Sequence, residues 1–400
     1  MNIRFIFIVL ITLFFISCSN IENKNALKSN HLDYVQDYIF NIGMSVRRKH
    51  LGIYFDKQKK QEYIYFGNVV TDKVIKIFSF SNELKWEIPL DKVLKETEIE
   101  DFSIISLDTI IVLSQYTNKI FFIDNKGDVW KKVALDTIIN HPVDSQYEFF
   151  TSSYSKININ NSNIILGVDW RKKDFDKGDD FKGYINWIKG FYYNVWNSDN
   201  YIRININDFY DYKFGCKLYK TLFPYDSIKG FVELYNYSLF NNEIYVHSDY
   251  SNKIIILNSD SLFITKTLTI KSKQSAIGAH LTPINEETLP KFQDLILKNA
   301  RSSGIIVRIF FNPDDEIYYI VILKQISYDF YKKNKYRPKI LMLYDKKFHK
   351  IEEINLPRDK SGFILSTNKG LLINRTIVNE SDNMNYFDQK LIFSLYKYYE

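Results

Sequence analysis

Cysteine is nearly absent from this sequence: only Cys18 and Cys216 occur among 400 residues. A framework of several disulfides is therefore excluded, and a folded domain must be stabilised by packing. Cys216 lacks the cysteine/histidine signature of a nucleophile around it, so we interpret it as a small buried hydrophobe.

Familiar catalytic and cofactor-binding motifs are also lacking. The sequence contains no G-x-S-x-G, no H-E-x-x-H, no phosphate-binding glycine loop and no G-x-G-x-x-G. No cofactor is therefore predicted. An enzyme is not excluded by this absence, because a propeller can assemble a site from residues far apart in sequence.

No metal site is predicted either. The stretch "DFDKGDD" at 174–180 has the clustered carboxylates that calcium prefers, but its glycine is at the fifth position of the loop, and no glutamate stands at the twelfth. We interpret it as a solvated acidic turn. The histidines are scattered, without metal-ligand spacing; they are His31, His50, His141, His247, His280 and His349. His247 lies within a predicted strand.

Strong charge of one sign is missing too. The formal net charge is +6, which is modest for this length and fits ordinary solubilising charge better than an acidic partner or contact with a membrane surface. Nucleic acid is not an expected partner. Hydrophobic residues make up 46% and aromatic residues 16% of the chain, with few glycines and prolines. This composition indicates a folded protein made mainly of strands.

The N-terminus carries the most specific signal. Arg4 precedes the apolar run Phe5–Ile16, which is too short to span a bilayer comfortably but has the length of a secretory signal. Phe15-Ile16-Ser17-Cys18 resembles a bacterial lipobox, with Phe in place of the commoner Leu. We expect residues 1–17 to be a signal peptide, Cys18 to be lipidated, and residues 18–30 to form a flexible tether.

A repeated phrase organises the remainder. Ile110–Ile120 and Ile244–Ile254 align without gaps and share seven of eleven residues, with looser copies at 71–77 and 338–343. Lys73 and Lys119 are 46 positions apart, about the length of a four-stranded propeller blade. The runs Ile120–Ile123 and Ile254–Leu257, which begin at the ends of the two close copies, consist of consecutive apolar residues and indicate strands covered on both faces.

We predict an all-β fold over residues 31–400, a six-bladed β-propeller with one short inserted helix near 285–301. The predicted blades span 50–90, 100–136, 148–210, 228–270, 303–357 and 361–399. The strand at 34–43 is expected to pair with the last blade and close the ring. The alternative is a pair of β-sandwich domains.

The lipobox, the tether and six units of the "NKIFFIDNKG" type resemble the six-bladed β-propeller lipoproteins of Bacteroidota-type bacteria, a domain of unknown function. The resemblance covers essentially the whole mature chain. It implies six blades rather than seven and a location in the cell envelope, with no catalytic residues.

The connections between the second and third strands (B–C) of each blade lie on one face of the disc. Those of blades three, five and six are predicted to be long, at Trp170–Lys189, Gln325–Arg337 and Asn374–Tyr386, and long loops on a rigid scaffold commonly carry function. Aromatic residues beside cations suit sugar rings or an acidic peptide. The candidate ligand-binding residues are Trp170, Arg171, Trp187, Trp196, Tyr328, Tyr331, Tyr336 and Arg337.

The leading hypothesis is a lipid-anchored envelope protein, with the outer membrane favoured because Ser19 gives no retention cue for the inner membrane. Its B–C loop face would engage a glycan, a peptide or a membrane-protein partner without catalysis. One alternative is a propeller hydrolase or lyase acting on polysaccharide, with or without the help of a metal, and with carboxylates around the axial channel. A third hypothesis is a structural partner in an outer-membrane complex.

Overall fold

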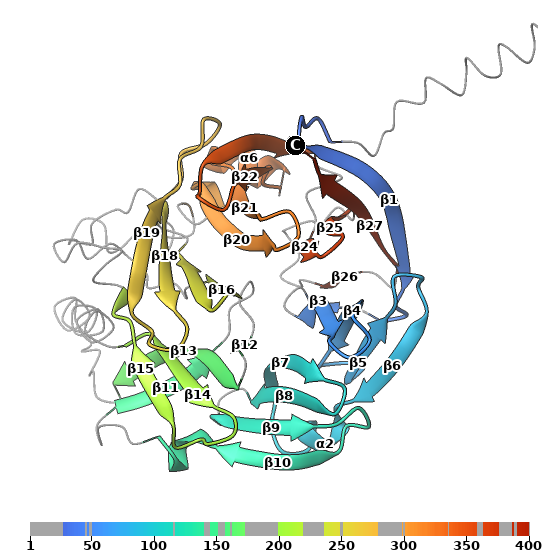
Figure 1. Ribbon diagram of the computed structural model, residues 1–400, viewed down its shortest axis with the longest axis vertical. Coiled ribbons are helices and arrows are strands. Elements are labelled where there is room, and N and C mark those ends of the chain that lie inside the picture. The colour runs from blue at the N-terminus through green and yellow to red at the C-terminus, as the bar shows by residue number, and fades with distance from the viewer. Residues whose placement is uncertain are drawn as a thin grey trace, which may run out of the picture.

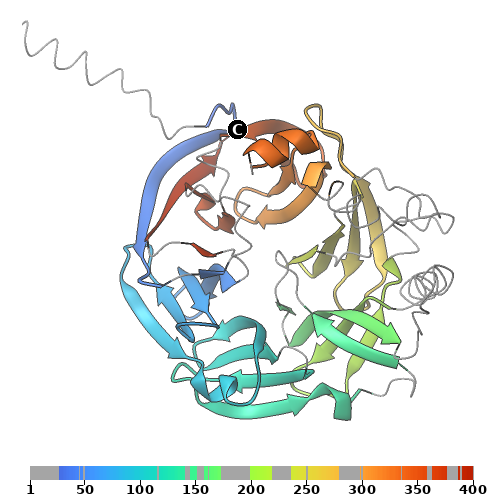
Figure 2. The same ribbon diagram turned by 180° about the vertical axis from the view of Figure 1, so that it is seen from behind.

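Six small antiparallel sheets stand around a central axis in the computed structural model, so the protein is a six-bladed β-propeller (Figures 1 and 2). The structure describes residues 27–44, 46–47, 50–114, 117–139, 145–150, 157–160, 162–172, 199–218, 236–248, 251–278, 298, 301–334, 336–357, 363–375, 386–387 and 390–399. The predicted fold is confirmed.

Blades one and two are consecutive four-stranded meanders. Blade one contains β3 (Leu51–Asp56), β4 (Gln61–Asn68), β5 (Val74–Phe78) and β6 (Leu84–Pro89). Blade two contains β7 (Ile99–Ser106), β8 (Thr109–Ser114), β9 (Lys119–Ile123) and β10 (Val129–Ala134). A short helix follows each outer strand: α2 (Asp91–Leu94) and the 3-10 helix η2 (Leu135–Thr137).

Blades four and five repeat this plan. Blade four contains β16 (Asn236–Phe240), β17 (Glu243–His247), β18 (Lys253–Asn258) and β19 (Ile264–Thr269). Blade five contains β20 (Ile305–Asn312), β21 (Ile317–Leu323), β22 (Lys339–Tyr344) and β23 (Lys350–Leu356). The first strand of each blade lies nearest the axis and the fourth lies at the rim (Figure 1).

Blade three differs at its inner edge. Two strands, β11 (Ser145–Phe150) and β12 (Asn158–Asn160), both pair with the long strand β13 (Asn163–Lys172). The blade continues outward with β14 (Tyr201–Asn205) and β15 (Tyr212–Gly215). Only the first half of β13 pairs with β14, so the β11–β13 pair extends beyond the rest of the sheet.

Blade six is completed by the N-terminal strand. Its inner strands are β24 (Ile364–Thr367), β25 (Gly370–Asn374) and β27 (Lys390–Tyr398), and β1 (Leu32–Asn41) pairs with β27 as the outermost strand. The predicted ring closure is confirmed. Asp37 fastens β1 by accepting hydrogen bonds from Ser394 Oγ (2.7 Å) and Arg375 Nη1 (2.9 Å). Beside this blade, β2 (Val46–Arg47) pairs with β26 (Tyr386–Phe387).

Adjacent blades are held together by apolar side chains from both faces of their middle strands. Ile120–Ile123 and Ile254–Leu257 are fully buried, as their unbroken apolar runs predict. One core cluster joins blades one and two through Tyr65, Phe102 and Phe121 among others. The outer strand β19 is mostly exposed by contrast, so hydrophobic burial is concentrated between the blades.

The repeated phrase covers most of strand two of a blade, the turn that follows and the start of strand three. In blades one, two and four, a backbone N–H just after the outer strand donates to a carbonyl of this turn; the pairs are Leu90 to Lys73 (2.9 Å), Leu135 to Asn118 (2.9 Å) and Ile270 to Asn252 (2.8 Å). These pairs show that Lys73 corresponds to Asn118, and Val74 to Lys119. The alignment of Lys73 with Lys119 was therefore wrong by one residue.

Helices are few. Most of the helix predicted at 285–301 lies outside the described residues, although Lys298, Arg301 and Ser302 at its end are helical. A second helix, α6 (Tyr328–Asn334), forms where the sequence predicted only a long loop. Within the described part of the chain, no helix has the length and apolarity needed to cross a bilayer.

Candidate functional site: the B–C face

The two faces of the disc differ in which connections they carry. The strands of each blade are lettered A to D from the axis outward. The B–C face carries the B–C connections and the linkers that lead to the next blade. The opposite face, the C–D face, carries the A–B and C–D turns. The B–C connections of blades one, two and four are short, at 69–73, 115–118 and 248–252. That of blade five runs from Lys324 to Pro338 and contains α6.

The blade-five connection is fastened to the propeller at both ends. The Lys324 amide donates to the Pro338 carbonyl (2.8 Å), which closes its base. The Gln325 amide donates to Ser275 Oγ (2.8 Å) and the Ile326 amide to the Ser302 carbonyl (2.9 Å). The linker from blade four to blade five therefore holds this connection in place.

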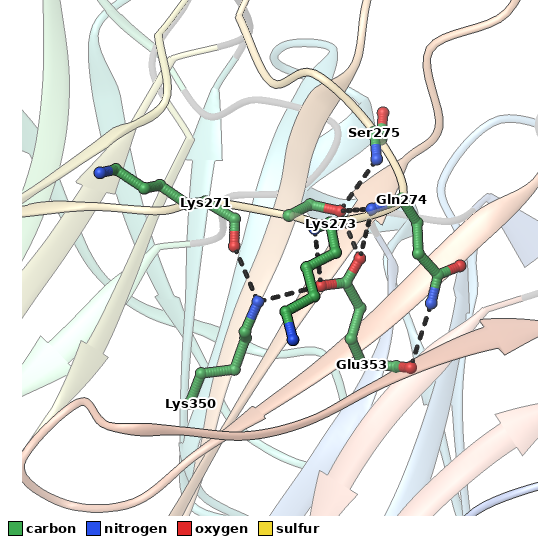
Figure 3. Close-up of polar contacts among 7 residues, drawn as sticks. Lys271, Lys273, Gln274, Ser275, Lys350 and Glu353 are labelled. Carbon is green, nitrogen blue, oxygen red and sulfur yellow. Dashed lines mark hydrogen bonds and ion pairs between the residues drawn. The ribbon is translucent and has the colours of Figure 1, made fainter.

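That linker is in turn held by Glu353 on the outer strand β23 (Figure 3). The Glu353 carboxylate accepts from Ser272 Oγ, from the backbone amides of Lys273 and Gln274 (both 3.1 Å) and from Lys350 Nζ (3.1 Å). Burial acts to raise the pKa of Glu353, but these hydrogen bonds together lower it below its ordinary value. The carboxylate is thus a charged anchor beneath the B–C face.

Local capping explains why α6 forms. Ser327 precedes the helix, its Oγ accepts from the Phe330 amide (3.1 Å), and its carbonyl accepts from the Tyr331 amide (3.1 Å). A serine in this position satisfies amides that have no partner within the helix. At the other end, Asn334 Nδ2 donates back to the Phe330 carbonyl (2.9 Å). The helix is therefore a defined projection from blade five.

Two of the four candidate residues in this connection are buried. Tyr331 is 7% exposed, and the Arg301 guanidinium lies 5.4 Å from its ring centroid. Arg337 is 3% exposed and donates from Nη2 to the Ser303 carbonyl. Both side chains support the base of α6, so the structure places them in the scaffold of this face rather than on its surface.

Other side chains of α6 face outward. Tyr328 is half-buried and stacks on Tyr331, with ring centroids 6.5 Å apart. Lys332 Nζ lies 4.9 Å from the Tyr328 ring centroid, and Phe330 is 42% exposed. Tyr336, the fourth candidate in the connection, is half-buried. Phe330 and Lys332 were not among the candidate residues, although the abundance of aromatic and basic residues in this loop could have indicated them.

The blade-three candidates have a different setting. Trp170 and Arg171 are part of β13, paired with Tyr147 and Gln146 of β11, so the backbone there is a strand and not the start of a loop. Trp187 and Trp196 lie outside the described residues. The extended β11–β13 pair ends on the B–C face, because β13 leads into the B–C connection of its blade.

Asp101 and His247 are buried polar residues in the inner two strands of their blades. Asp101 Oδ2 on β7 accepts from the Ile157 amide (3.0 Å), which ties blade two to the start of β12. Burial lowers the pKa of His247 to about 3, so this strand residue is neutral at ordinary pH. No group of three acidic, histidine or cysteine side chains suited to a metal occurs among the described residues.

Cys216 is half-buried, whereas the sequence predicted a buried residue. It packs beside the core cluster of blades three and four, and burial raises the pKa of its thiol to about 12. A thiol with so high a pKa is a poor nucleophile at neutral pH.

Comparison with known proteins supports the fold and leaves the ligand open. No protein-family model and no curated protein matches the chain. A solved structure of a DUF4221 family member from Bacteroides vulgatus ATCC 8482 is similar with a TM-score of 0.64 and 15% identity, covering 93% of this chain and 100% of that chain. At this identity the likeness concerns the fold alone.

Two further solved structures match more weakly. A Bacteroides fragilis NCTC 9343 protein described as exported gives a TM-score of 0.48 at 10% identity, covering 94% of this chain and 98% of that one. Virginiamycin B lyase from Staphylococcus aureus gives a TM-score of 0.41 at 11% identity, covering 90% of this chain and 99% of that one.

Proposed function

We propose that this protein is a lipid-anchored binding protein of the cell envelope, with the outer membrane as its favoured location. Its anchor is Cys18, and its B–C face engages a glycan, a peptide or a membrane-protein partner. The observation that carries the proposal is α6: a capped helix, fixed to a rigid blade, that exposes Phe330 and Lys332 beside Tyr328.

The chemistry of this surface favours a ligand that has both an apolar face and hydrogen-bonding or anionic groups. An exposed aromatic ring stacks on the flat face of a sugar or on an apolar side chain. A neighbouring ammonium group binds a carboxylate or sulfate on the same ligand. Uronic-acid-containing glycans and acidic peptides meet both conditions.

A matched pair of double variants tests the site. Phe330→Ala/Lys332→Ala removes the aromatic and basic groups of α6, and Phe263→Ala/Lys213→Ala removes an equivalent pair on the C–D face, where Lys213 Nζ lies 4.7 Å from the Phe263 ring centroid. Binding would be measured on arrays of acidic polysaccharides and acidic peptides.

We expect a loss of binding of about tenfold or more for the α6 variant alone. Equal binding by both variants and the unmodified protein would reject α6 as the site. The lipid anchor is tested separately: mass spectrometry of the N-terminal peptide should show a lipid on Cys18, and Cys18→Ser should lack it.

A further inference from the structure

Most exposed large hydrophobic side chains of the described residues lie on the C–D face or at its rim. On three successive blades, Trp130 at the start of β10 is 54% exposed, Tyr210 in the blade-three turn 77%, and Phe263 in the blade-four turn 68%. The B–C face offers only Val70 and Phe330 among the described residues. Exposed aromatic residues gathered on one face mark an interaction surface.

Lysines also pack on phenylalanines of these turns, of which Phe263 is exposed, Phe348 is half-buried and Phe209 is buried. A lysine from the outer strand of one blade stacks on a phenylalanine in the C–D turn of the next; the pairs are Lys131 with Phe209 (4.5 Å), Lys213 with Phe263 (4.7 Å) and Lys266 with Phe348 (5.5 Å). We call these three pairs the aromatic–lysine row. It crosses blades two to five along one face of the disc.

The same face receives the N-terminal segment. Leu32, the first residue of β1, pairs with Tyr398 at the end of β27, and the outer strand of each blade begins on the C–D face. Figure 1 shows the start of β1 beside the C-terminal end of the chain. The described N-terminal segment therefore joins β1 on the C–D side.

The connection to Cys18 is also short. Leu27 is already buried, and Ser29 Oγ donates to Glu352 Oε2 (2.6 Å), so residues 27–30, predicted as tether, contact the propeller. Only eight residues, 19–26, separate Cys18 from Leu27. Fully extended, this segment reaches at most about 30 Å.

We propose that the C–D face rests on the phospholipid surface in which Cys18 is anchored, with Tyr210, Phe263 and the aromatic–lysine row at the headgroup level. This inference rests on the proposed lipidation of Cys18. Aromatic rings and lysines with apolar stems are the side chains that favour this interface. The B–C face then points away from the membrane, toward its ligand.

Apolar contact, more than charge, carries this interaction. Asp208, Asp211 and Asp260 lie in the same turns as the exposed aromatics, so the surface is not strongly basic. Binding to vesicles should therefore change little between low and high salt, whereas an interaction based on lysines and anionic lipid would weaken strongly.

The first experiment uses an unlipidated chain that begins at Ser19 and contains every element of the described fold. It is sedimented with vesicles of phosphatidylethanolamine and phosphatidylglycerol. Tyr210→Ser/Phe263→Ser should bind at least about tenfold more weakly than the unmodified chain. The control Val70→Ser/Phe330→Ser, on the B–C face, should bind normally. Equal binding by both variants overturns the proposal.

The second experiment measures hydrogen exchange in the lipidated protein reconstituted into the same vesicles. Slower exchange is expected at 206–211 and 259–263, with no change at 328–334. Protection at 328–334 instead, or protection at neither site, overturns the proposed orientation. If Cys18 proves unlipidated, the proposed anchor fails, and the sedimentation experiment still decides whether the C–D face binds lipid.

Discussion

The two faces of this propeller are built in different ways. The C–D face consists of short turns whose aromatic side chains pair with lysines from the neighbouring blade. The B–C face carries long connections, and in blade five the aromatic and basic residues divide between a buried base, with Tyr331 and Arg337, and an exposed tip, with Phe330 and Lys332. Aromatic content alone therefore does not identify a binding surface, because the same residue types are buried and support the fold at some positions and are exposed at others.

The largest loss of stability is expected from a variant at the ring closure, because it disturbs both faces together. Phe40 on the closing strand β1 is fully buried among Phe66, Phe78 and Phe393. Phe40→Ala should lower the free energy of unfolding by about 3–5 kcal/mol, because it leaves a cavity at the ring closure.

Chemical denaturation measures this effect, and Val35→Ala on the exposed side of β1 is the control. If Phe40→Ala lowers the free energy of unfolding by less than about 1 kcal/mol, closure of the ring by β1 contributes little to stability.

A second variant should disturb the B–C face alone. A Cβ atom on Gly304 would lie 1.9 Å from the Ala276 carbonyl oxygen, so Gly304→Ala must push the 270–278 linker away from blade five. We expect a destabilisation of about 1–3 kcal/mol. Hydrogen exchange should accelerate at 324–338 and stay unchanged at 259–263. Ser302→Ala, two residues away, is the control, and equal acceleration on both faces would contradict this assignment.

The charged anchor beneath the B–C face predicts a dependence on pH. The pKa of Glu353 is lower in the folded protein than its ordinary value of 4.5, so its contribution is present above that value and is lost as pH falls through the folded pKa. Glu353→Gln should cost about 1–3 kcal/mol at pH 7.

The difference between Glu353→Gln and the unmodified protein should shrink as pH falls from 4.5 through the lowered pKa of Glu353, because protonation then makes both side chains neutral. The control is Glu316→Gln, which removes an exposed ion pair with Lys346 and should change stability by less than about 0.5 kcal/mol. A Glu353→Gln difference that is constant from pH 3 to 7 would contradict the charged anchor.

The smallest effects on stability are expected at the exposed tips. Tyr210→Ser and Phe330→Ser remove exposed side chains on opposite faces, and each should change the free energy of unfolding by no more than about 0.5 kcal/mol. Denaturation curves check this directly. If either substitution lowers the free energy of unfolding by more than about 1 kcal/mol, the side chain that it removes has a structural role, and the variant is unsuitable as a probe of binding.

Much of the fold could be predicted because its signals are local. Consecutive apolar residues at 120–123 and 254–257 predicted strands covered on both faces, and the repeat predicted the blades. The pairing of β1 with β27 followed from a lone strand that needed a partner. The helix α6 was missed because the aromatic and basic residues of 325–337 obscured a short capping signal at Ser327.

The candidate site could be predicted only in part. The sequence located the long connection of blade five, but it could not show that Tyr331 and Arg337 face inward, because this depends on Arg301 and Ser303 from another segment. Trp170 and Arg171 were also predicted to be loop residues, because the strand β11 with which they pair is a separate stretch of the chain.

By itself, the sequence determined the strands and their order, because spacing and turn residues act over a few neighbouring positions. Only the tertiary structure decided which aromatic residues are exposed and which face the N-terminal segment leaves from. The physical reason is that exposure, stacking and strand direction at the rim depend on contacts between blades, and those contacts join residues that are far apart in the chain.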